Sequence, residues 1–168
     1  MDDVQHSDDQ RNTPIGSDRS HPFAGFRHIA YLHDGTAHGL EALHEAVSLA
    51  ALFKARLDVA IIVDDRRGRE PLKVTLGRTA DERLAVRQSL IARTAERAGV
   101  RCSQTIVTGR PSRAGLDFAR ERGADLIVIS ATSSSYLHDR LWGSRSARIA
   151  RDGACSVLIV RVAPNLTS

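Results

Sequence analysis

The sequence predicts a single α/β domain built on an open parallel sheet of five strands, with helices on both faces. Two observations carry this prediction. Short apolar runs alternate regularly with longer segments in which apolar residues recur at helical spacing. The run at 56–65, "RLDVAIIVDD", is almost continuously apolar, as is typical of a strand covered on both faces. With 168 residues, the chain is long enough to bury a core of this kind.

The apolar runs define the predicted strands. The first, "FRHIAYL", ends at "HDGT", which is a turn signal. Strand–helix alternation places consecutive strands parallel, because each crossover returns the chain to the same edge of the sheet. The five predicted strands are 26–32, 56–65, 100–109, 124–130 and 155–162.

Helical spacing between these runs predicts four helices, at 37–55, 80–99, 110–123 and 143–153. Gly99 is a natural C-cap for the second helix. The third is entered through Pro111, with Ser112 as a candidate N-cap, and stops at Gly123. The residues expected to face the core are Leu40, Leu43, Val47, Ala50 and Ala51 in the first helix, and Leu84, Leu90, Ile91 and Ala95 in the second.

This pattern fills residues 25–163, which we predict to be one domain. Residues 1–24 are polar and cannot repay their ordering entropy by burial, so we expect a disordered tail, and 164–168 form a short C-terminal tail. No apolar run approaches the roughly 20 residues that span a bilayer, and the N-terminus lacks the apolar region of a secretory signal. We therefore expect a cytoplasmic protein that does not contact membranes.

Composition argues against several classes of function. The formal net charge is +4 and the aromatic content is 4%, and the arginines are mixed with acids, so the chain lacks the basic and aromatic surface expected for nucleic-acid binding. Cys102 and Cys155 lie in apolar segments without metal-ligand spacing, which favours small buried thiols. No histidine pairs with Cys, Asp or Glu at a spacing typical of zinc, and we expect no metal.

The ends of two strands carry the polar residues expected at a site. Ligands of open parallel sheets bind beyond the carboxyl ends of strands, where the strand order reverses. The first strand ends in Leu32, His33 and Asp34, and the fourth is followed by the small residues 130–135 and by a helix that begins near 143–144. Small residues and a helix N-terminus indicate phosphate binding.

A catalytic serine is not expected in this loop. Ser134, His138 and Asp139 are close in sequence, but the Gly-x-Ser-x-Gly elbow is missing and no third group orients the histidine. The chain also lacks Gly-x-x-x-x-Gly-Lys-Ser/Thr and Gly-x-Gly-x-x-Gly. We predict no catalytic residues.

Three blocks of the sequence together resemble the universal stress protein family: "HIAYLHDGTAHGLEALHEAVSLA", "ERAGVRCSQTIVTGRPSRAGLDFARERGADLIVIS" and "GSRSARIARDGACSVLIVRV". The resemblance covers roughly residues 26–162. It implies a flavodoxin-like sheet of order 3-2-1-4-5, a cytoplasmic regulatory role in the stress response with an unknown protein partner, and a homodimer formed through the last strand, 155–162. One branch of the family binds ATP and another does not.

The resemblance also implies site residues. Asp34 matches the aspartate that holds the nucleotide, although its carboxylate could instead cap the turn. Ile62 matches the apolar residue that covers the base, and His33 could line the pocket or be a polar loop residue. At the last helix, Ser144 and Ser146 could bind phosphate or cap the helix. The complete predicted cofactor-binding set is Leu32, His33, Asp34, Ile62, Ser130, Ser133, Gly143, Ser144, Arg145 and Ser146.

Serines replace glycines in the phosphate loop. The family pattern is Gly-x-x-Gly, nine residues, then Gly-Ser/Thr; here Ser130 and Ser133 occupy the first two glycine positions, whereas Gly143 and Ser144 are kept. If such a glycine has positive φ, serine costs on the order of 1 kcal/mol, and its Cβ fills space that phosphate needs. We expect weak or no ATP binding. The alternatives are ATP or AMP binding through the serine hydroxyls, or a slow ATPase or small hydrolase that uses Asp34 or His33.

Overall fold

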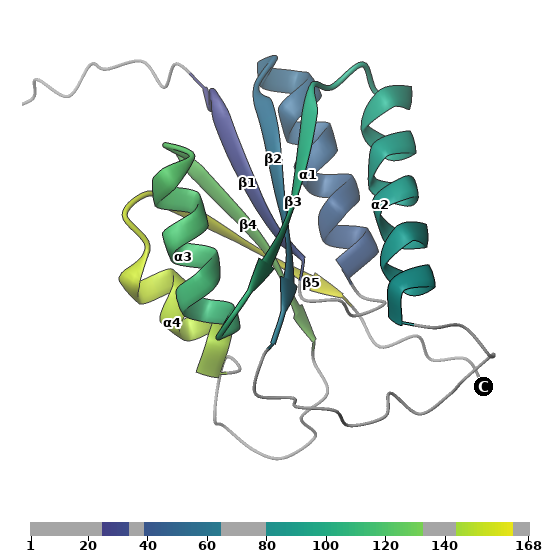
Figure 1. The fold of residues 1–168 in the computed structure, drawn as a ribbon. Coiled ribbons are helices and arrows are strands. Elements are labelled where there is room, and N and C mark those ends of the chain that lie inside the picture. Colours follow the sequence, from purple (N-terminus) through teal and green to yellow (C-terminus); the bar gives the residue numbers. More distant parts are fainter. Residues whose placement is uncertain (1–24, 34–38, 65–79, 133–143, 163–168) are drawn as a thin grey trace, which may run out of the picture.

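The computed structural model describes residues 25–33, 39–64, 80–132 and 144–162. Five parallel strands form one sheet of order β3-β2-β1-β4-β5, and Figure 1 shows α1 and α2 on one face and α3 and α4 on the other. The predicted fold class and strand order are confirmed. The elements are β1 (His28–His33), α1 (Gly39–Phe53), β2 (Arg56–Val63), α2 (Ala80–Arg97), β3 (Cys102–Thr108), α3 (Pro111–Glu121), β4 (Leu126–Thr132), α4 (Ser144–Asp152) and β5 (Ser156–Val162).

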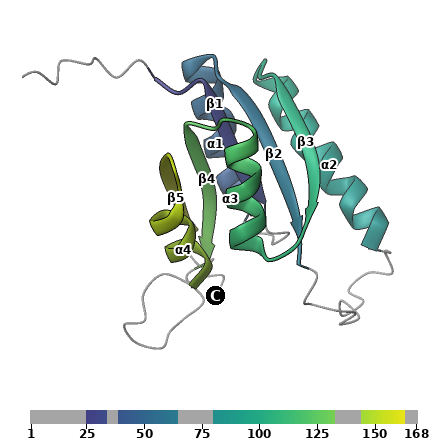
Figure 2. The ribbon, with the colours of Figure 1, turned by 60° about the vertical axis from the view of Figure 1, so that its left-hand side comes forward.

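Alternation along the strands divides the core into two layers. Figure 2 shows the helices that cover these layers on the two faces of the sheet. Ile29 and Tyr31 of β1 pack with α1 and α2, whereas Ala30 and Leu32 pack with α3 and α4. Successive side chains of a strand point to opposite faces, so one strand supplies both layers. β1 therefore connects the two halves of the core.

Helical spacing predicted the core residues of α1 and α2 only in part. Leu43, Val47, Ala50, Ile91 and Ala95 are buried as expected, and Leu84 is half-buried. The expectation is wrong for three others: Ala51 is exposed, and Leu40 and Leu90 are each 39% exposed. Ala51 is one residue, or about 100°, beyond the buried stripe of α1. Leu40 and Leu90 instead border a hollow between the two helices.

The start of α3 also differs from the prediction. Arg110 is the N-cap and makes no side-chain capping bond, while Pro111 lies at the start of the helix. Ser112 is inside the first turn and buried, so the prediction that it caps the helix is wrong. Proline is well suited to the first helical position because its missing N–H needs no partner there. Gly99, the predicted C-cap of α2, has a φ of 67°, and Gly123, the predicted stop of α3, follows the C-cap Arg122 with a φ of 61°.

A buried charged cluster, defined by Asp58 and its partners, lies on the α3 side of β2 and β3. The Asp58 side chain is 2% exposed and accepts bonds from Arg56 at 2.8 and 2.9 Å and from the Ser103 hydroxyl. Arg122, just after α3, lies 3.4 Å from the same carboxylate and donates to Thr105 at 3.0 Å. This Asp58 cluster ties α3 to the amino half of the sheet.

Candidate functional site

The strand order reverses at β1, which lies between β2 and β4. Leu32 of β1 pairs with Ala60 of β2 on one side and with Ile129 of β4 on the other. The next residues of these two strands, His33 and Ser130, therefore lie toward the carboxyl edge of the sheet. Reversals of this kind are where open parallel sheets bind ligands. The structure thus brings Leu32, His33, Ile62 and Ser130 to one edge, as the predicted site requires.

The face toward α3 is apolar at this edge. Leu32 and Ile62 are both buried and belong to the same layer of the core. Gly115 of α3 faces them: a Cβ there would lie 2.5 Å from Leu32 Cδ1 and 3.4 Å from Ile62 Cδ1. The missing side chain lets α3 approach the two strands closely. The role of Gly115 depends on packing between segments that are distant in the sequence, so no sequence motif marks it.

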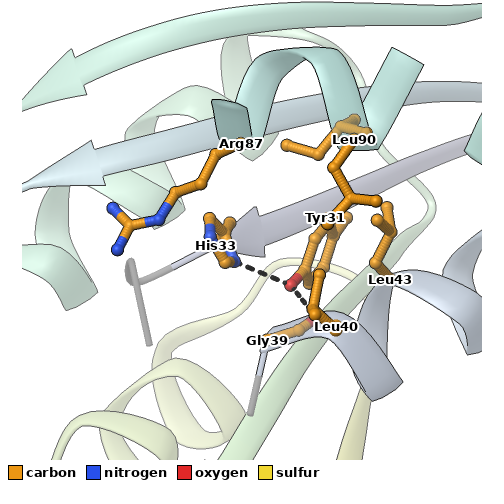
Figure 3. A pocket seen from close by; sticks show the side chains of 8 residues that line it. Tyr31, His33, Gly39, Leu40, Leu43, Arg87 and Leu90 are labelled. Atoms are coloured by element: carbon orange, nitrogen blue, oxygen red, sulfur yellow. Dashed lines mark hydrogen bonds between the residues drawn. The ribbon is translucent and has the colours of Figure 1, made fainter. Parts of the chain in front are cut away.

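The opposite face at this edge is polar. His33 is the last residue of β1 and only 4% exposed, so the alternative that it is a polar loop residue is wrong. Its Nδ1 lies 3.0 Å from the Tyr31 hydroxyl, which donates to the Gly39 carbonyl (Figure 3). Because the Tyr31 proton goes to Gly39, the hydroxyl oxygen accepts from His33 and Nδ1 carries the imidazole proton. We call these three residues the Tyr31 cluster.

Gly39 is needed for this arrangement. A Cβ at Gly39 would lie 2.3 Å from His33 Nδ1 and 2.9 Å from the Tyr31 hydroxyl oxygen. Tyr31 is the second residue that orients the His33 ring. A period of two along β1 is the signal that places Tyr31 and His33 on one face. Gly39 could not be found in this way, because it lies beyond the turn.

Ser130 is a strand residue. β4 extends two residues beyond the predicted end, and Ser130 pairs with Val160 of β5. Among the non-glycine residues that the structure describes, only Lys54 has a positive φ. Serine therefore introduces no left-handed strain at position 130, and that part of the argument against phosphate binding does not apply there. The half-buried side chain still occupies space beside the backbone.

The remaining predicted site residues lie either at the start of α4 or outside the described structure. α4 begins at Ser144, with Arg145 and the half-buried Ser146 in its first turn. Since α4 leads from β4 to β5, its N-terminus faces the carboxyl edge of the sheet. Asp34, Ser133 and Gly143 lie outside the described residues.

Neither cysteine provides a reactive group. Both are free thiols. Burial, followed by the nearby Asp58 carboxylate, raises the pKa of Cys102 to about 11. Burial also raises the pKa of Cys155, with Asp125 adding to the effect. Both thiols therefore stay protonated at neutral pH, which disfavours nucleophilic chemistry. Within the described segments no three His, Cys, Asp or Glu residues gather to hold a metal, and no helix is long and apolar enough to cross a membrane.

The sequence profile of the universal stress protein family matches residues 25–161. The chain belongs to this family. Universal stress protein MJ0531 of Methanocaldococcus jannaschii is 27% identical over 144 residues, a match covering 81% of this chain and 82% of that protein. A universal stress protein of Thermus aquaticus, described as lying in the QAH/OAS sulfhydrylase 3′ region, is 31% identical over 140 residues, covering 81% and 99%.

A solved structure extends the comparison to a ligand complex. A universal stress protein in complex with cAMP is 25% identical to this chain, with a TM-score of 0.65. The match covers 83% of this chain and 99% of that one. The resemblance deduced from the three sequence blocks is therefore confirmed at the level of the family and fold. Nucleotide binding is a property of that relative.

Proposed function

We propose that this universal stress protein is a cytoplasmic regulatory module of the stress response that has no catalytic machinery and binds ATP weakly or not at all. The observation that carries the proposal is the side chain of Ser130 at the strand reversal. There the family pattern has glycine, and phosphate approaches bare backbone. Ser130 has an ordinary strand conformation, so the effect on binding is steric: Cβ and hydroxyl fill the space.

Binding of cAMP or AMP is the second candidate function. Leu32 and Ile62 end the apolar layer that packs against Gly115, and the adenosine part of a ligand would lie at this end of the layer, at the carboxyl edge of the sheet. The relative in complex with cAMP supports this candidate. A nucleotide with one phosphate needs less of the altered loop than a triphosphate does. The adenosine half of the site would then be retained while the triphosphate half is lost.

Calorimetric titration of the purified full chain with ATP, AMP and cAMP tests both candidates, and a phosphate-release assay on the ATP sample tests for catalysis. We expect no phosphate release and, for ATP, the weakest binding of the three. Micromolar ATP affinity would contradict the main proposal, and no binding of AMP or cAMP would contradict the second. Turnover that is lost in Asp34→Ala would support a slow ATPase instead.

Glycine substitutions identify the cause of weak ATP binding. The double variant Ser130→Gly, Ser133→Gly should raise ATP affinity if the serine side chains obstruct phosphate. Ser156→Gly is the matched control, because Ser156 is a strand serine that pairs with Leu126 at the amino end of β4. No gain in the double variant would show that other changes in the loop dominate.

Self-association through β5 is part of the same proposal. β5 is at the end of the sheet order, and one side of its backbone is not paired with another strand of the described sheet. Exposed strand edges of this kind pair readily with a second chain. Sedimentation velocity over a range of protein concentrations should show a homodimer, and a monomer throughout would contradict this part of the proposal. The protein partner expected for the regulatory role is a different molecule from the second copy of this chain, and its identity is unknown.

A further inference from the structure

The charged side chains of α2 are segregated around the helix. At about 100° per residue, its four arginines after the first turn begins fall within one sector of about 120°, and its three acids fall outside that sector. The arginines are Arg83, Arg87, Arg93 and Arg97, and the acids are Asp81, Glu82 and Glu96. We call the sector that holds the arginines the arginine flank of α2.

The arginine flank also exposes two large apolar residues. Val86 keeps 47% of its surface exposed and Leu90 keeps 39%, and the two lie one helical turn apart. Leu40 of α1, which is also 39% exposed, borders the same small hollow as Leu90. The flank therefore combines positive charge with adjacent exposed apolar side chains, which suits a chain segment that carries both acidic and apolar residues.

The protein itself contains a segment of this composition. Residues 1–9, "MDDVQHSDD", contain four aspartates, no lysine or arginine, and the apolar residues Met1 and Val4. The four aspartates equal in number the four arginines of the flank. Residues 1–24 lie outside the described residues, so the argument for their position comes from charge and from where the chain enters the domain.

The chain enters the domain beside the C-terminal end of α1. Gly25 has a φ of 82°, and a Cβ there would lie 2.5 Å from Cδ1 of Phe53. The ring of Phe26 packs edge-on against the ring of Phe53, with 5.4 Å between their centroids. Both α1 and α2 end at the edge of the sheet where β1 begins (Figure 1). The preceding residues are therefore attached on the face that carries the arginine flank, at the end near Arg97.

The connection is long enough for residues 1–9 to reach the whole flank. From Arg97 to Arg83 the helix extends about 21 Å, at about 1.5 Å per residue. Residues 10–24 can span up to about 50 Å when extended. A tether of this kind gives an effective concentration on the order of millimolar, so even weak affinity is sufficient for docking within one chain.

We propose that residues 1–9 dock on the arginine flank of α2, with their aspartates beside the arginines and Val4 over Val86 and Leu90. Exposed ion pairs are individually weak and are screened by salt, so the contact is reversible and depends on ionic strength. The flank is on the helix surface, away from the carboxyl edge of the sheet, so the proposal does not depend on nucleotide binding.

NMR spectra of the isotope-labelled full chain at two salt concentrations test the docking. Raising NaCl from about 0.1 to about 1 M shortens the screening length from about 10 to about 3 Å and should release the segment. We expect the amide signals of residues 2–9 and of the arginine flank to shift together, and to be independent of protein concentration. Unchanged signals overturn the proposal. Signals that depend on protein concentration also overturn it, because they would indicate docking on a second copy.

A triple arginine variant separates docking from a general effect of salt. At low salt it should bring the signals of residues 2–9 to their high-salt positions, since three exposed pairs together correspond to about a tenfold loss of docking. Glutamine is chosen because it keeps the helix propensity of arginine. Arg87 is left unchanged because it also lines the hollow. The substitutions are Arg83→Gln, Arg93→Gln and Arg97→Gln.

The matched control removes three positive charges from the opposite face of the sheet. Its substitutions, at exposed arginines of α3 and α4, are Arg113→Gln, Arg148→Gln and Arg151→Gln. Equal effects of the two triple variants overturn the proposal. If the α2 variant disturbs the fold, the quadruple variant with asparagine at Asp2, Asp3, Asp8 and Asp9 provides the decision. It should shift the amides of the arginine flank as high salt does, and unchanged α2 signals overturn the proposal.

Discussion

The Asp58 cluster and the Tyr31 cluster are both built around a buried side chain, yet they differ in composition and in position. The Asp58 cluster joins a carboxylate to two arginines and two hydroxyls on the α3 side, in the amino half of β2 and β3. The Tyr31 cluster contains no carboxylate or arginine and lies on the α1 side, at the carboxyl end of β1. The cluster with the carboxylate and the arginines is thus away from the candidate site, and the Tyr31 cluster borders it.

The difference indicates separate roles: the Asp58 cluster stabilises the fold, and the Tyr31 cluster sets the geometry of the site. Removing one partner of a buried ion pair leaves uncompensated charge and is strongly destabilising. A cluster of this kind suits the end of the sheet where no ligand has to enter. At the carboxyl edge, an imidazole, a hydroxyl and a carbonyl fix the geometry without placing a permanent charge in the core. Changes in the Asp58 cluster should therefore alter stability, and changes in the Tyr31 cluster should also alter the site.

Asp58→Ala is expected to have the largest effect, a loss of about 3 kcal/mol in the free energy of unfolding. The substitution removes the carboxylate that Arg56 and Arg122 share and leaves the Ser103 hydroxyl without it. Both arginines are partly exposed and can regain water, so the loss should fall at the lower end for buried pairs. Urea denaturation measures it. A loss below about 1 kcal/mol would show that the cluster is dispensable.

Gly39→Ala should have the next largest effect, about 2 kcal/mol, because the new Cβ overlaps the His33 ring at 2.3 Å. The ring cannot move away without breaking its bond to Tyr31. Unlike Asp58→Ala, this variant should also change the environment of His33, measured as a shift in its imidazole NMR signals. Unchanged signals would mean that the backbone of α1 moves instead.

The strands and helices show which features can be predicted from the sequence, and the end of β4 shows one that cannot. Apolar periodicity is a local signal, and it is sufficient for the strands and the helices, whereas the strand order and the choice of Ile62 as a site residue come from the resemblance to the family. The sequence predicts that β4 ends at Ser130, because the apolar run gives way to small residues from Ala131 onward. Pairing with β5 continues the strand to Thr132, which is a long-range effect that outweighs local preference.

The residues that the sequence did not reveal are those joined across turns or between layers. Gly39 and Gly115 are defined by what a Cβ would touch, and those atoms belong to other elements. Leu40 and Leu90 have the helical spacing of core residues. This spacing does not distinguish a position inside the core from one that borders a hollow. Ser130 has the predicted position, whereas its backbone conformation depends on its partner strand.

Tyr31→Phe should cost about 1.5 kcal/mol, because it leaves the buried Nδ1–H of His33 without the hydroxyl acceptor. The ring and its packing are kept, so the comparison with Gly39→Ala separates the hydrogen bond from the steric lock. The double variant should be less destabilised than the sum of the two, since both disturb the same contact. Full additivity in urea denaturation would contradict a shared origin.

Gly115→Ala on the opposite face should have the smallest effect, about 1 kcal/mol or less. The added Cβ lies 2.5 Å from Leu32 Cδ1, but this atom ends a side chain that can rotate, whereas the atoms near Gly39 belong to a hydrogen-bonded ring. Gly115 is also inside a helix, where alanine is favoured by about 1 kcal/mol and offsets part of the strain. Because Gly115 packs against Leu32 and Ile62 at the edge proposed for the nucleotide, cAMP affinity should fall more in this variant than in Tyr31→Phe. The reverse order in calorimetry would place the ligand on the α1 side of the edge.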